Sequence, residues 1–265
     1  RFLGVDTAEI SFTLPGSSTF QSIGGPAWAA FLEEPFADRW GVIDLHPALR
    51  DALQTRLGAD CAANHHRHAM AAQRGLETEV EADLAAMGGE RASFRFFVAF
   101  ANEVMDQYGR LLGYLNREQA SGPRPLDYNG RLLAAGLALP YFIWPNINPF
   151  RKQAALIEAV PAPGTAALIA QRESSLRQAR EWVRAARDLR KGVFAGDDPL
   201  RLEPFELRFL AGRRAPNRWV IDLSRDDDRL LAPQRYFEIP RPEDRLFVPA
   251  EYVPLFVERG WQRAR

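Results

Sequence analysis

The chain has 265 residues, which is enough for one large domain or two small domains with a hydrophobic core. Its 34 Lys and Arg residues balance its 34 Asp and Glu residues, so no overall field attracts a polyanion and any nucleic-acid site has to be local. A single cysteine, Cys61, excludes a disulfide within the chain, and no apolar run is long enough to span a membrane.

The first nine residues, RFLGVDTAE, combine an arginine with two carboxylates at the end of a short apolar run. Leu3 and Val5 are typical of a buried strand, and Asp6 comes where that strand ends. Carboxylate and carbonyl oxygens are the ligands of calcium and magnesium, and Arg1 has the side chain that binds phosphate through two parallel hydrogen bonds. The segment therefore suggests a joint metal and phosphate site, with Glu9 able to deprotonate water. Solvated acids in a turn are the simpler alternative.

Residues 11–74 form a long segment that holds several large aromatic side chains. We expect a strand over residues 10–14, a loop over 16–25, and helices over 46–58 and 60–74, with Asp44 as a possible N-cap. So many aromatic residues favour packed structure over disorder. We interpret the segment as a cover on the core, and a partner-binding surface is the alternative. The aromatic residues are Trp28, Phe31, Phe36 and Trp40.

The helix expected over residues 60–74 carries potential zinc ligands. Cys61 and His65 are the only Cys/His pair spaced four residues apart, and no second cysteine or acidic partner stands at the usual spacing. Histidines in contact with solvent on a helix surface, including His66 and His68, are the simpler interpretation.

The middle of the chain alternates helical and extended patterns. Apolar residues at helical spacing predict a helix over 76–88, and a Phe-rich strand over 93–101 follows it. Gly109 marks a turn that places Arg110 at the head of a strand over 111–115. A further helix over 127–136 has Asp127 as its expected N-cap and Gly136 at its end.

Residues 165–191 predict one long helix, and after residue 196 the composition changes. Arginines recur along the helix, and a face in contact with solvent is a simpler interpretation of them than contact with phosphate. We expect residues 205–210 and 219–223 to form a hairpin, and residues 195–265 to be a C-terminal extension of unknown role. The arginines are Arg172, Arg177, Arg180, Arg184, Arg187 and Arg190.

Four of these segments, in this order, resemble the staphylococcal nuclease family. They are Arg-x-x-x-Val-Asp-Thr-x-Glu at residues 1–9, Asp-x-Tyr-Gly-Arg-x-Leu-x-Tyr at 106–114, Asn-x-x-Leu-x-x-x-Gly-Leu-Ala at 129–138, and Tyr141 with Pro145-Asn146 close behind. The resemblance covers about residues 1–10 and 75–194. It implies an α+β fold in which a five-stranded β-barrel of the OB type packs against helices. Residues 1–194 would then be a nuclease-like domain with an insertion at 11–74.

The resemblance also implies one calcium ion, held by Asp6 and by the carbonyl of Thr7. The family has a further aspartate ligand on a strand that would precede Arg1. Because the chain begins with an arginine, we expect it to be a segment of a longer protein, and the calcium site is incomplete in it. Ala8 stands where the family usually has a proline. Asn129 matches an asparagine whose role in the family is structural.

The other site residues carry roles that the family suggests. Glu9 would be the general base, and Arg1 and Arg110 would stabilise charge on the phosphate in the transition state. Tyr108 and Tyr141 would contact the substrate. The function implied is a calcium-dependent phosphodiesterase that cuts DNA and/or RNA with little sequence preference.

Two alternatives stay open. One is a catalytically silent module of the same fold that binds nucleic acid or protein, and the other is a regulated nuclease subunit of a larger bacterial assembly. A protein partner would bind through residues 11–74 or 195–265. A silent copy has no chemical need for the four residues together, so their presence favours an active nuclease. The four are Arg1, Asp6, Glu9 and Arg110.

Overall fold

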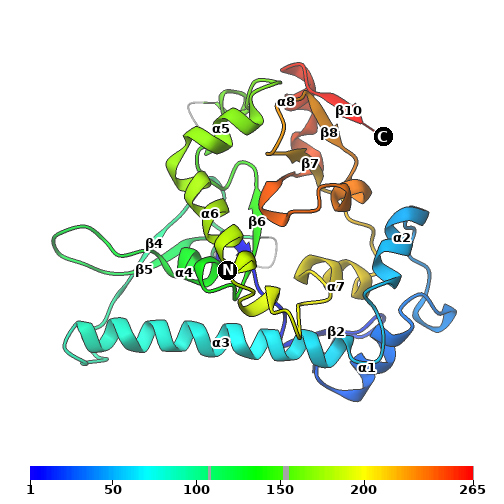
Figure 1. The fold of residues 1–265 in the computed structure, drawn as a ribbon, viewed down its shortest axis with the longest axis horizontal. Helices are drawn as coiled ribbons and strands as arrows, with labels where there is room; N and C mark the ends of the chain where they lie inside the picture. Colours follow the sequence, from blue (N-terminus) through cyan, green and yellow to red (C-terminus); the bar gives the residue numbers. More distant parts are fainter. Residues whose placement is uncertain (107–108, 152–154, 265) are drawn as a thin grey trace.

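A six-stranded mixed sheet forms the centre of the computed structural model, which describes residues 1–106, 109–151 and 155–264 (Figure 1). The strand order is β1-β6-β9-β7-β8-β10. The β6–β9 and β8–β10 pairs are parallel, and the other pairs are antiparallel. The strands are β1 (Gly4–Asp6), β6 (Leu139–Ile143), β9 (Arg245–Val248), β7 (Trp219–Asp222), β8 (Arg229–Leu231) and β10 (Gln262–Ala264).

The neighbouring interior strands β6 and β9 are apolar along almost their whole length, as strands covered on both faces are. Successive side chains point to opposite faces. Tyr141 and Phe247 enter a core built with α1, α2 and α7, whereas Phe142 and Leu246 enter a core built with α5, α6 and α8. The sheet therefore lies between two layers of helices.

The helices of these two layers are short, apart from α6. Several begin with proline in the first turn, where its missing N–H costs nothing. The N-cap of α2 is His46, which accepts from the N–H of Ala48, so the expectation of Asp44 was wrong. The helices are α1 (Pro26–Glu33), α2 (Pro47–Gln54), α5 (Ala166–Arg172), α6 (Ser174–Asp188), α7 (Pro204–Ala211) and α8 (Val253–Glu258).

A third core lies between β1, α4 (Tyr128–Ala134) and α6. Asp127 caps α4 by accepting from the N–H of Gly130 at 2.7 Å, which confirms the expected N-cap. Asn129 donates to the carbonyls of Leu3 and Gly113, at 2.9 and 3.2 Å. The asparagine therefore holds the start of the chain to the middle of the chain, in keeping with the expected structural role.

The helix α3 (Cys61–Ala86) is a single helix of 26 residues along one side of the molecule, where the sequence suggested two helices (Figure 1). Gly75 lies between the two expected helices. A Cβ at Gly75 would lie 2.2 Å from Cδ1 of Leu137, so the glycine allows Leu137 to approach α3 closely. Neighbouring helix formers carry α3 through this position.

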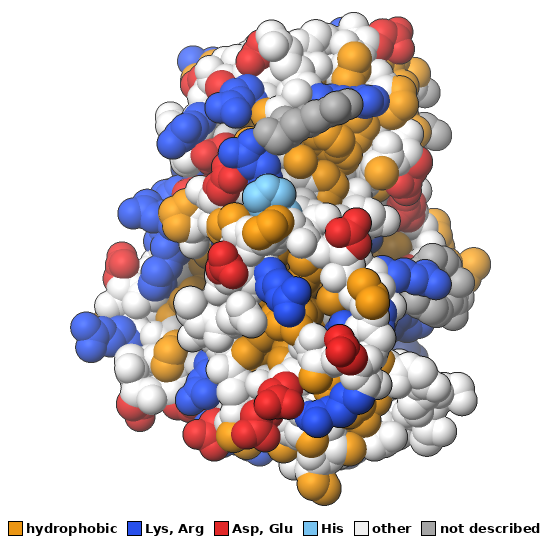
Figure 2. All heavy atoms as spheres, turned by 90° about the vertical axis from the view of Figure 1, so that its right-hand side faces the viewer, with side chains coloured by type: hydrophobic (Ala, Val, Ile, Leu, Met, Phe, Trp, Pro, Cys, Tyr) orange, Lys and Arg blue, Asp and Glu red, His pale blue; other side chains and the backbone are white. Residues whose placement is uncertain are grey.

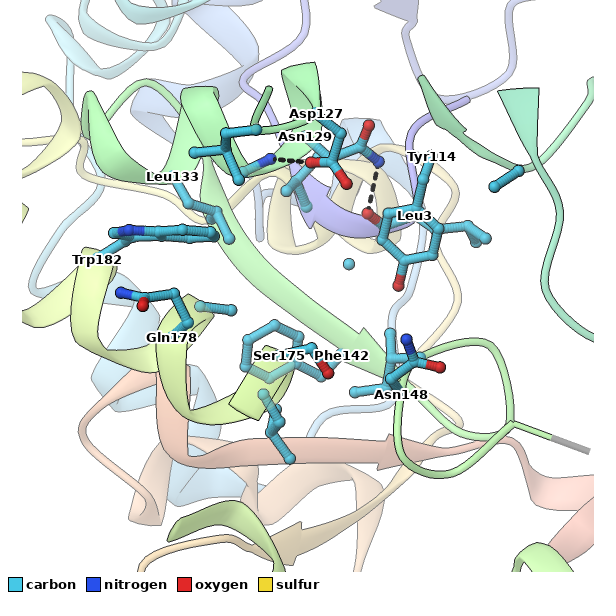
Figure 3. Close-up of a pocket in the computed structure, with 18 of the residues that line it drawn as sticks. Leu3, Tyr114, Asp127, Asn129, Leu133, Phe142, Asn148, Ser175, Gln178 and Trp182 are labelled. Atoms are coloured by element: carbon cyan, nitrogen blue, oxygen red, sulfur yellow. Dashed lines mark hydrogen bonds between the residues drawn. The ribbon is translucent and has the colours of Figure 1, made fainter. Parts of the chain in front are cut away.

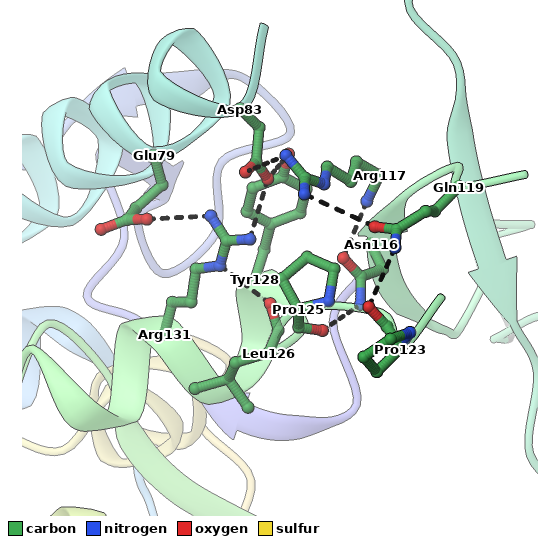
Figure 4. A network of polar contacts seen from close by, with 10 residues as sticks. All are labelled: Glu79, Asp83, Asn116, Arg117, Gln119, Pro123, Pro125, Leu126, Tyr128 and Arg131. Carbon is green, nitrogen blue, oxygen red and sulfur yellow. Dashed lines mark hydrogen bonds and ion pairs between the residues drawn. The ribbon is translucent and has the colours of Figure 1, made fainter. Parts of the chain in front are cut away.

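Acidic residues of α3 bind the hairpin β4 (Phe96–Ala99)–β5 (Tyr114–Arg117) and the helix α4 (Figure 4). The carboxylate of Asp83, 7% exposed, accepts from Arg117, Arg131 and the hydroxyl of Tyr128 at 3.3, 2.8 and 2.9 Å. Arg131 also pairs with Glu79 at 3.0 Å. One buried carboxylate therefore fixes three elements to one another.

The segment 11–74 packs as a cover. Trp28 and Phe31 have no exposed surface, and their rings meet edge to face. A small antiparallel pair, β2 (Ser11–Thr13) and β3 (Phe20–Ser22), precedes α1, so the expected loop over 16–25 contains a strand. A protein partner for this segment stays a prediction.

The long helix expected over 165–191 is divided at residue 173 into α5 and α6. Several arginines of α6 pair with buried acids. Arg180 is 4% exposed and pairs with Asp244 at 2.6 Å. Arg187 and Arg184 contact Glu243. For Arg180 the expectation of a solvated face was wrong, because its partner is buried.

Residues 205–210, expected as a strand, belong to the helix α7. Two features at the N-terminus of α7 favour a helix. Pro204 stands in the first turn, and the side chains of Glu203 and Glu206 each accept from the backbone N–H of the other residue. The short 3-10 helices are η1 (Asp38–Trp40), η2 (Leu156–Ala159), η3 (Gly192–Phe194), η4 (Pro233–Glu238), η5 (Pro242–Asp244) and η6 (Ala250–Tyr252).

The α+β class is confirmed, and the five-stranded barrel stays a prediction. Within the described ranges the main sheet is open, since β1 and β10 are its two edges. Strands from residues 1–194 and from residues 195–265 share this sheet. The proposed division into a domain and an extension also stays a prediction.

Acidic and basic side chains intermingle on the face shown in Figure 2, with apolar side chains between them. This face has no broad area of one charge, as the zero net charge leads one to expect. Among the described residues, none of the helices combines the length and the apolar character that a membrane span requires.

Candidate active site

Asp6 is the centre of the cluster that the sequence pointed to. It ends β1 opposite Leu139 of β6, and only 4% of its surface is exposed. An isolated buried carboxylate is costly, so it requires cationic partners. The structure provides two, Arg208 and Arg1.

Arg208 of α7 is the main partner of the acidic pair. Its Nη1 and Nη2 donate to the two carboxylate oxygens of Asp6 at 3.0 and 2.6 Å. Nη1 also donates to Glu9 Oε1 at 2.7 Å. Burial alone would lower the pKa of Arg208, but the charges of Asp6 and Glu9 and the hydrogen bond to Asp6 raise it above its ordinary value. One guanidinium thus bridges the two predicted acids.

His65 of α3 helps to position Glu9 through a hydrogen bond to its backbone. The backbone N–H of Glu9 donates to Nε2 of His65 at 2.9 Å. His65 has no exposed surface, and burial, with the nearby charge of Arg208, lowers its pKa to about 3. The imidazole is therefore neutral and accepts through Nε2. For His65 the expectation of a solvated helix histidine was wrong.

Arg1 lies beside the same carboxylate. Its Nη2 is 3.6 Å from Asp6 Oδ1. The backbone of Arg1 is held by Leu111 and Gly113: its nitrogen donates to the carbonyl of Leu111 at 2.6 Å, and its carbonyl accepts from Gly113 at 3.1 Å. Arg1 precedes β1, so the alternation of side chains along the strand does not place it on the opposite face from Asp6.

Arg110 precedes Leu111, whose carbonyl accepts from the backbone nitrogen of Arg1. Its Nε donates to Asp106 Oδ2 at 2.7 Å, and 54% of its side chain is exposed. The structure therefore brings the backbone segment of Arg110 to the segment of Arg1, while its guanidinium pairs with Asp106. Its role toward a phosphate stays a prediction.

The other predicted residues lie in different surroundings. Tyr141 is 5% exposed, stacks on Phe205 at 5.4 Å and accepts from Arg218 at 2.9 Å. Thr7 is half-buried next to Asp6. Tyr108 lies outside the described residues. Substrate contacts of the two tyrosines stay predictions, and Tyr141 is part of the core beneath the sheet.

The carboxylates, as they are arranged, do not fit a divalent cation. Arg208 engages both oxygens of Asp6 and one oxygen of Glu9. The positive charges of Arg208 and Arg1 already balance the negative charges of Asp6 and Glu9. Over residues 1–106, 109–151 and 155–264, no three His, Cys, Asp or Glu side chains are grouped so that they could hold a metal ion. Calcium at Asp6 and Thr7 therefore stays a prediction.

A pocket of about 530 Å³ lies behind β1, between α4, α6 and β6 (Figure 3). Leu3, Phe142 and Trp182 give it an apolar wall, and Tyr114 and Gln178 add polar groups. Neither carboxylate of the acidic pair lines it. The pocket is therefore separate from the candidate site.

Two residues of the site were missed by the reasoning from sequence. His65 was assigned to a solvated face, and Arg208 to a strand. One signal was present: a carboxylate at the end of a buried strand, with a second acid close by, needs more positive charge than Arg1 supplies. That signal does not say which of many arginines provides the charge.

Comparison with known proteins gives a partial match. The chain is 31% identical over 127 residues to Endonuclease YhcR of Bacillus subtilis (strain 168). The match covers 48% of this chain and 8% of that protein. No protein-family model and no solved structure matches the chain. Over about half of its length, the chain is thus similar to a small part of an endonuclease.

Proposed function

We propose that the protein is a phosphodiesterase that cuts DNA and/or RNA with little sequence preference. One observation supports this proposal above others: Arg1 and Glu9, each with about a third of its side chain exposed, contact the same buried Asp6–Arg208 pair. A cation that binds phosphate and a carboxylate that binds water thus border one site. The similarity to an endonuclease supports the same chemistry.

The proposed reaction is attack of water on the phosphorus atom. Glu9 accepts a proton from the water as the water oxygen bonds to phosphorus. The bond to the leaving oxygen breaks, and that oxygen keeps the electron pair and takes a proton from solvent water. Arg1 stabilises the negative charge that develops on the phosphate oxygens, which suits a group that is always ionised. Arg110 is assigned the same role and would exchange part of its contact with Asp106 for phosphate.

Degradation of plasmid DNA and of an RNA transcript tests the proposal. We expect cutting by the wild-type protein, and a fall of about a hundredfold or more in Glu9→Gln, in line with loss of a general base. The same degradation assays, run once with calcium and once with EDTA, measure whether cutting requires a divalent cation. Arg214→Gln is the control, because Arg214 is exposed and belongs to the turn after α7. Intact nucleic acid in every wild-type assay would contradict the proposal.

A silent binding module is the second candidate. The observation that favours it is that Arg208 holds both carboxylates and Tyr141 is buried. A module of this kind would bind labelled single-stranded nucleic acid and leave it intact, and Glu9→Gln would bind as wild type does.

A further inference from the structure

We propose that Arg208 determines the cation requirement of this site: its guanidinium lies between Asp6 and Glu9, and a divalent cation binds these carboxylates only in competition with it. The inference rests on the proposed function only in taking the acidic pair as the site of chemistry. It concerns which cation occupies the pair, and this can be measured without any turnover.

The contacts of Arg208 are those that a divalent cation would need. Three hydrogen bonds of 2.6 to 3.0 Å engage both oxygens of Asp6 and Oε1 of Glu9. Calcium and magnesium bind carboxylates through the same oxygens. The guanidinium of Arg208 lies between the two carboxylates, where a cation that bridges them would lie, and it would repel that cation by its positive charge. The arginine and a bridging ion therefore compete.

The backbone of Arg208 cannot easily move away from the acids, because buried side chains and hydrogen bonds anchor α7. Leu207 and Leu210 have no exposed surface. Glu206 accepts from Arg56 at 2.7 Å through each of its oxygens and from Tyr236 at 2.5 Å. An incoming cation thus has to displace the side chain of Arg208 alone, which is 19% exposed.

Charge balance favours the same conclusion. Asp6 and Glu9 carry two negative charges, and Arg1 and Arg208 carry two positive charges, so the cluster is neutral as it stands. Without the charge of Arg208 the cluster has an excess negative charge, which attracts a divalent ion strongly in a partly buried site. Arg1 alone holds Asp6 at the longer distance of 3.6 Å.

Calcium titration by calorimetry tests the proposal on wild type, Arg208→Gln and Arg208→Lys. Glutamine keeps hydrogen-bonding capacity and removes the charge. Its calcium dissociation constant should be at least about tenfold lower than that of wild type, since removing a nearby unit charge is worth more than this factor. Lysine keeps the charge and loses the paired hydrogen bonds, so its dissociation constant should fall by a smaller factor, about threefold.

Two controls locate the effect. Arg214→Gln removes an exposed arginine from the same region and should bind calcium as wild type does. Adding Asp6→Asn to Arg208→Gln should abolish the gain, because the gained ion sits on Asp6. A gain that survives Asp6→Asn would overturn the proposal.

Folding of each variant is checked by its thermal transition. A folded Arg208→Gln that binds calcium no more tightly than wild type overturns the proposal. If that variant does not fold, a folded Arg208→Lys with an unchanged dissociation constant overturns it. Failure of the proposed function would appear instead as absence of cutting in all variants, whatever the calcium isotherms give.

Discussion

The backbone N–H of Glu9 donates to Nε2 of His65, 56 residues further along the chain, at 2.9 Å. This hydrogen bond attaches the candidate base to the long helix α3, whose register is fixed by buried residues. This contact fixes the backbone of Glu9, and the hydrogen bond from Arg208 holds its carboxylate. The helix α3 thus contributes to the position of Glu9 although it lies far from it in the sequence.

His65→Ala should reduce cutting by up to about a hundredfold, because a carboxylate displaced by about 1 Å loses its alignment with the phosphate. His65→Gln should retain much more activity, since the amide oxygen of glutamine can accept the same hydrogen bond. The measurement is the separation of kcat from KM on a short oligonucleotide: kcat should fall and KM should change little. Equal activity of the alanine and glutamine variants would contradict this role for His65.

The stability of the protein should depend on pH through His65. The pKa of His65 is about 3 in the folded protein, against the ordinary value of 6.5, chiefly because burial disfavours the charged form. As pH falls below 6.5 the unfolded chain takes up this proton first, so the contribution of His65 to stability is complete above 6.5 and is lost progressively toward pH 3. Urea denaturation of wild type and His65→Gln between about pH 8 and pH 5 measures this, before most carboxylates titrate. The free energy of unfolding should decline less in the variant; identical slopes would refute the assignment.

Gly192→Ala should destabilise the protein by about 2 kcal/mol or more, since backbone strain and a clash add. Gly192 has φ +52°, and a Cβ there would lie 2.0 Å from the carbonyl oxygen of Gly136. Gly164→Ala is the matched control: its φ is +76°, but nothing lies within 4 Å of the added Cβ. Gly164→Ala therefore measures the backbone strain alone, which costs about 1–2 kcal/mol of the free energy of unfolding. Chemical denaturation of both variants gives the comparison, and equal losses would show that the Gly136 contact is unimportant.

Arg180→Met should cost about 3 kcal/mol or more of the free energy of unfolding, because it leaves the buried Asp244 without its main partner. The two side chains are 5% and 6% exposed and lie 2.6 Å apart. Arg177→Met on the same helix is the control, since its pair with Glu181 is half exposed and 3.7 Å long, and such pairs contribute 1 kcal/mol or less. A loss for Arg180→Met as small as for the control would contradict the importance of the buried pair.

Local signals predicted the helix α4, which carries its own caps. Asp127 and Gly136 bound α4 as expected, because the cap hydrogen bond and the positive φ of glycine are local properties. Gly75 was misleading, since a glycine can serve packing against Leu137 as well as end a helix. Residues 205–210 were misleading too, because their apolar run suits a buried helix as well as a strand.

The site was predictable where its residues lie close together along the chain. Asp6, Glu9 and Arg1 come from one short segment, and the structure groups them. Arg208 lies about 200 residues away, and only the packing of α7 under the sheet brings it to Asp6. Among thirty-four basic residues, a single sequence contains no signal that selects this one.

The parallel pairing of β6 with β9 has a consequence for synthesis of the chain. β9 follows β6 by about a hundred residues, which at roughly 5–20 residues per second is several seconds of translation. During this interval β6 has an open, apolar edge that can pair with other chains. The nascent protein is thus most exposed to misassociation before α7 and β9 emerge, and the same late segment delivers Arg208 to the acids.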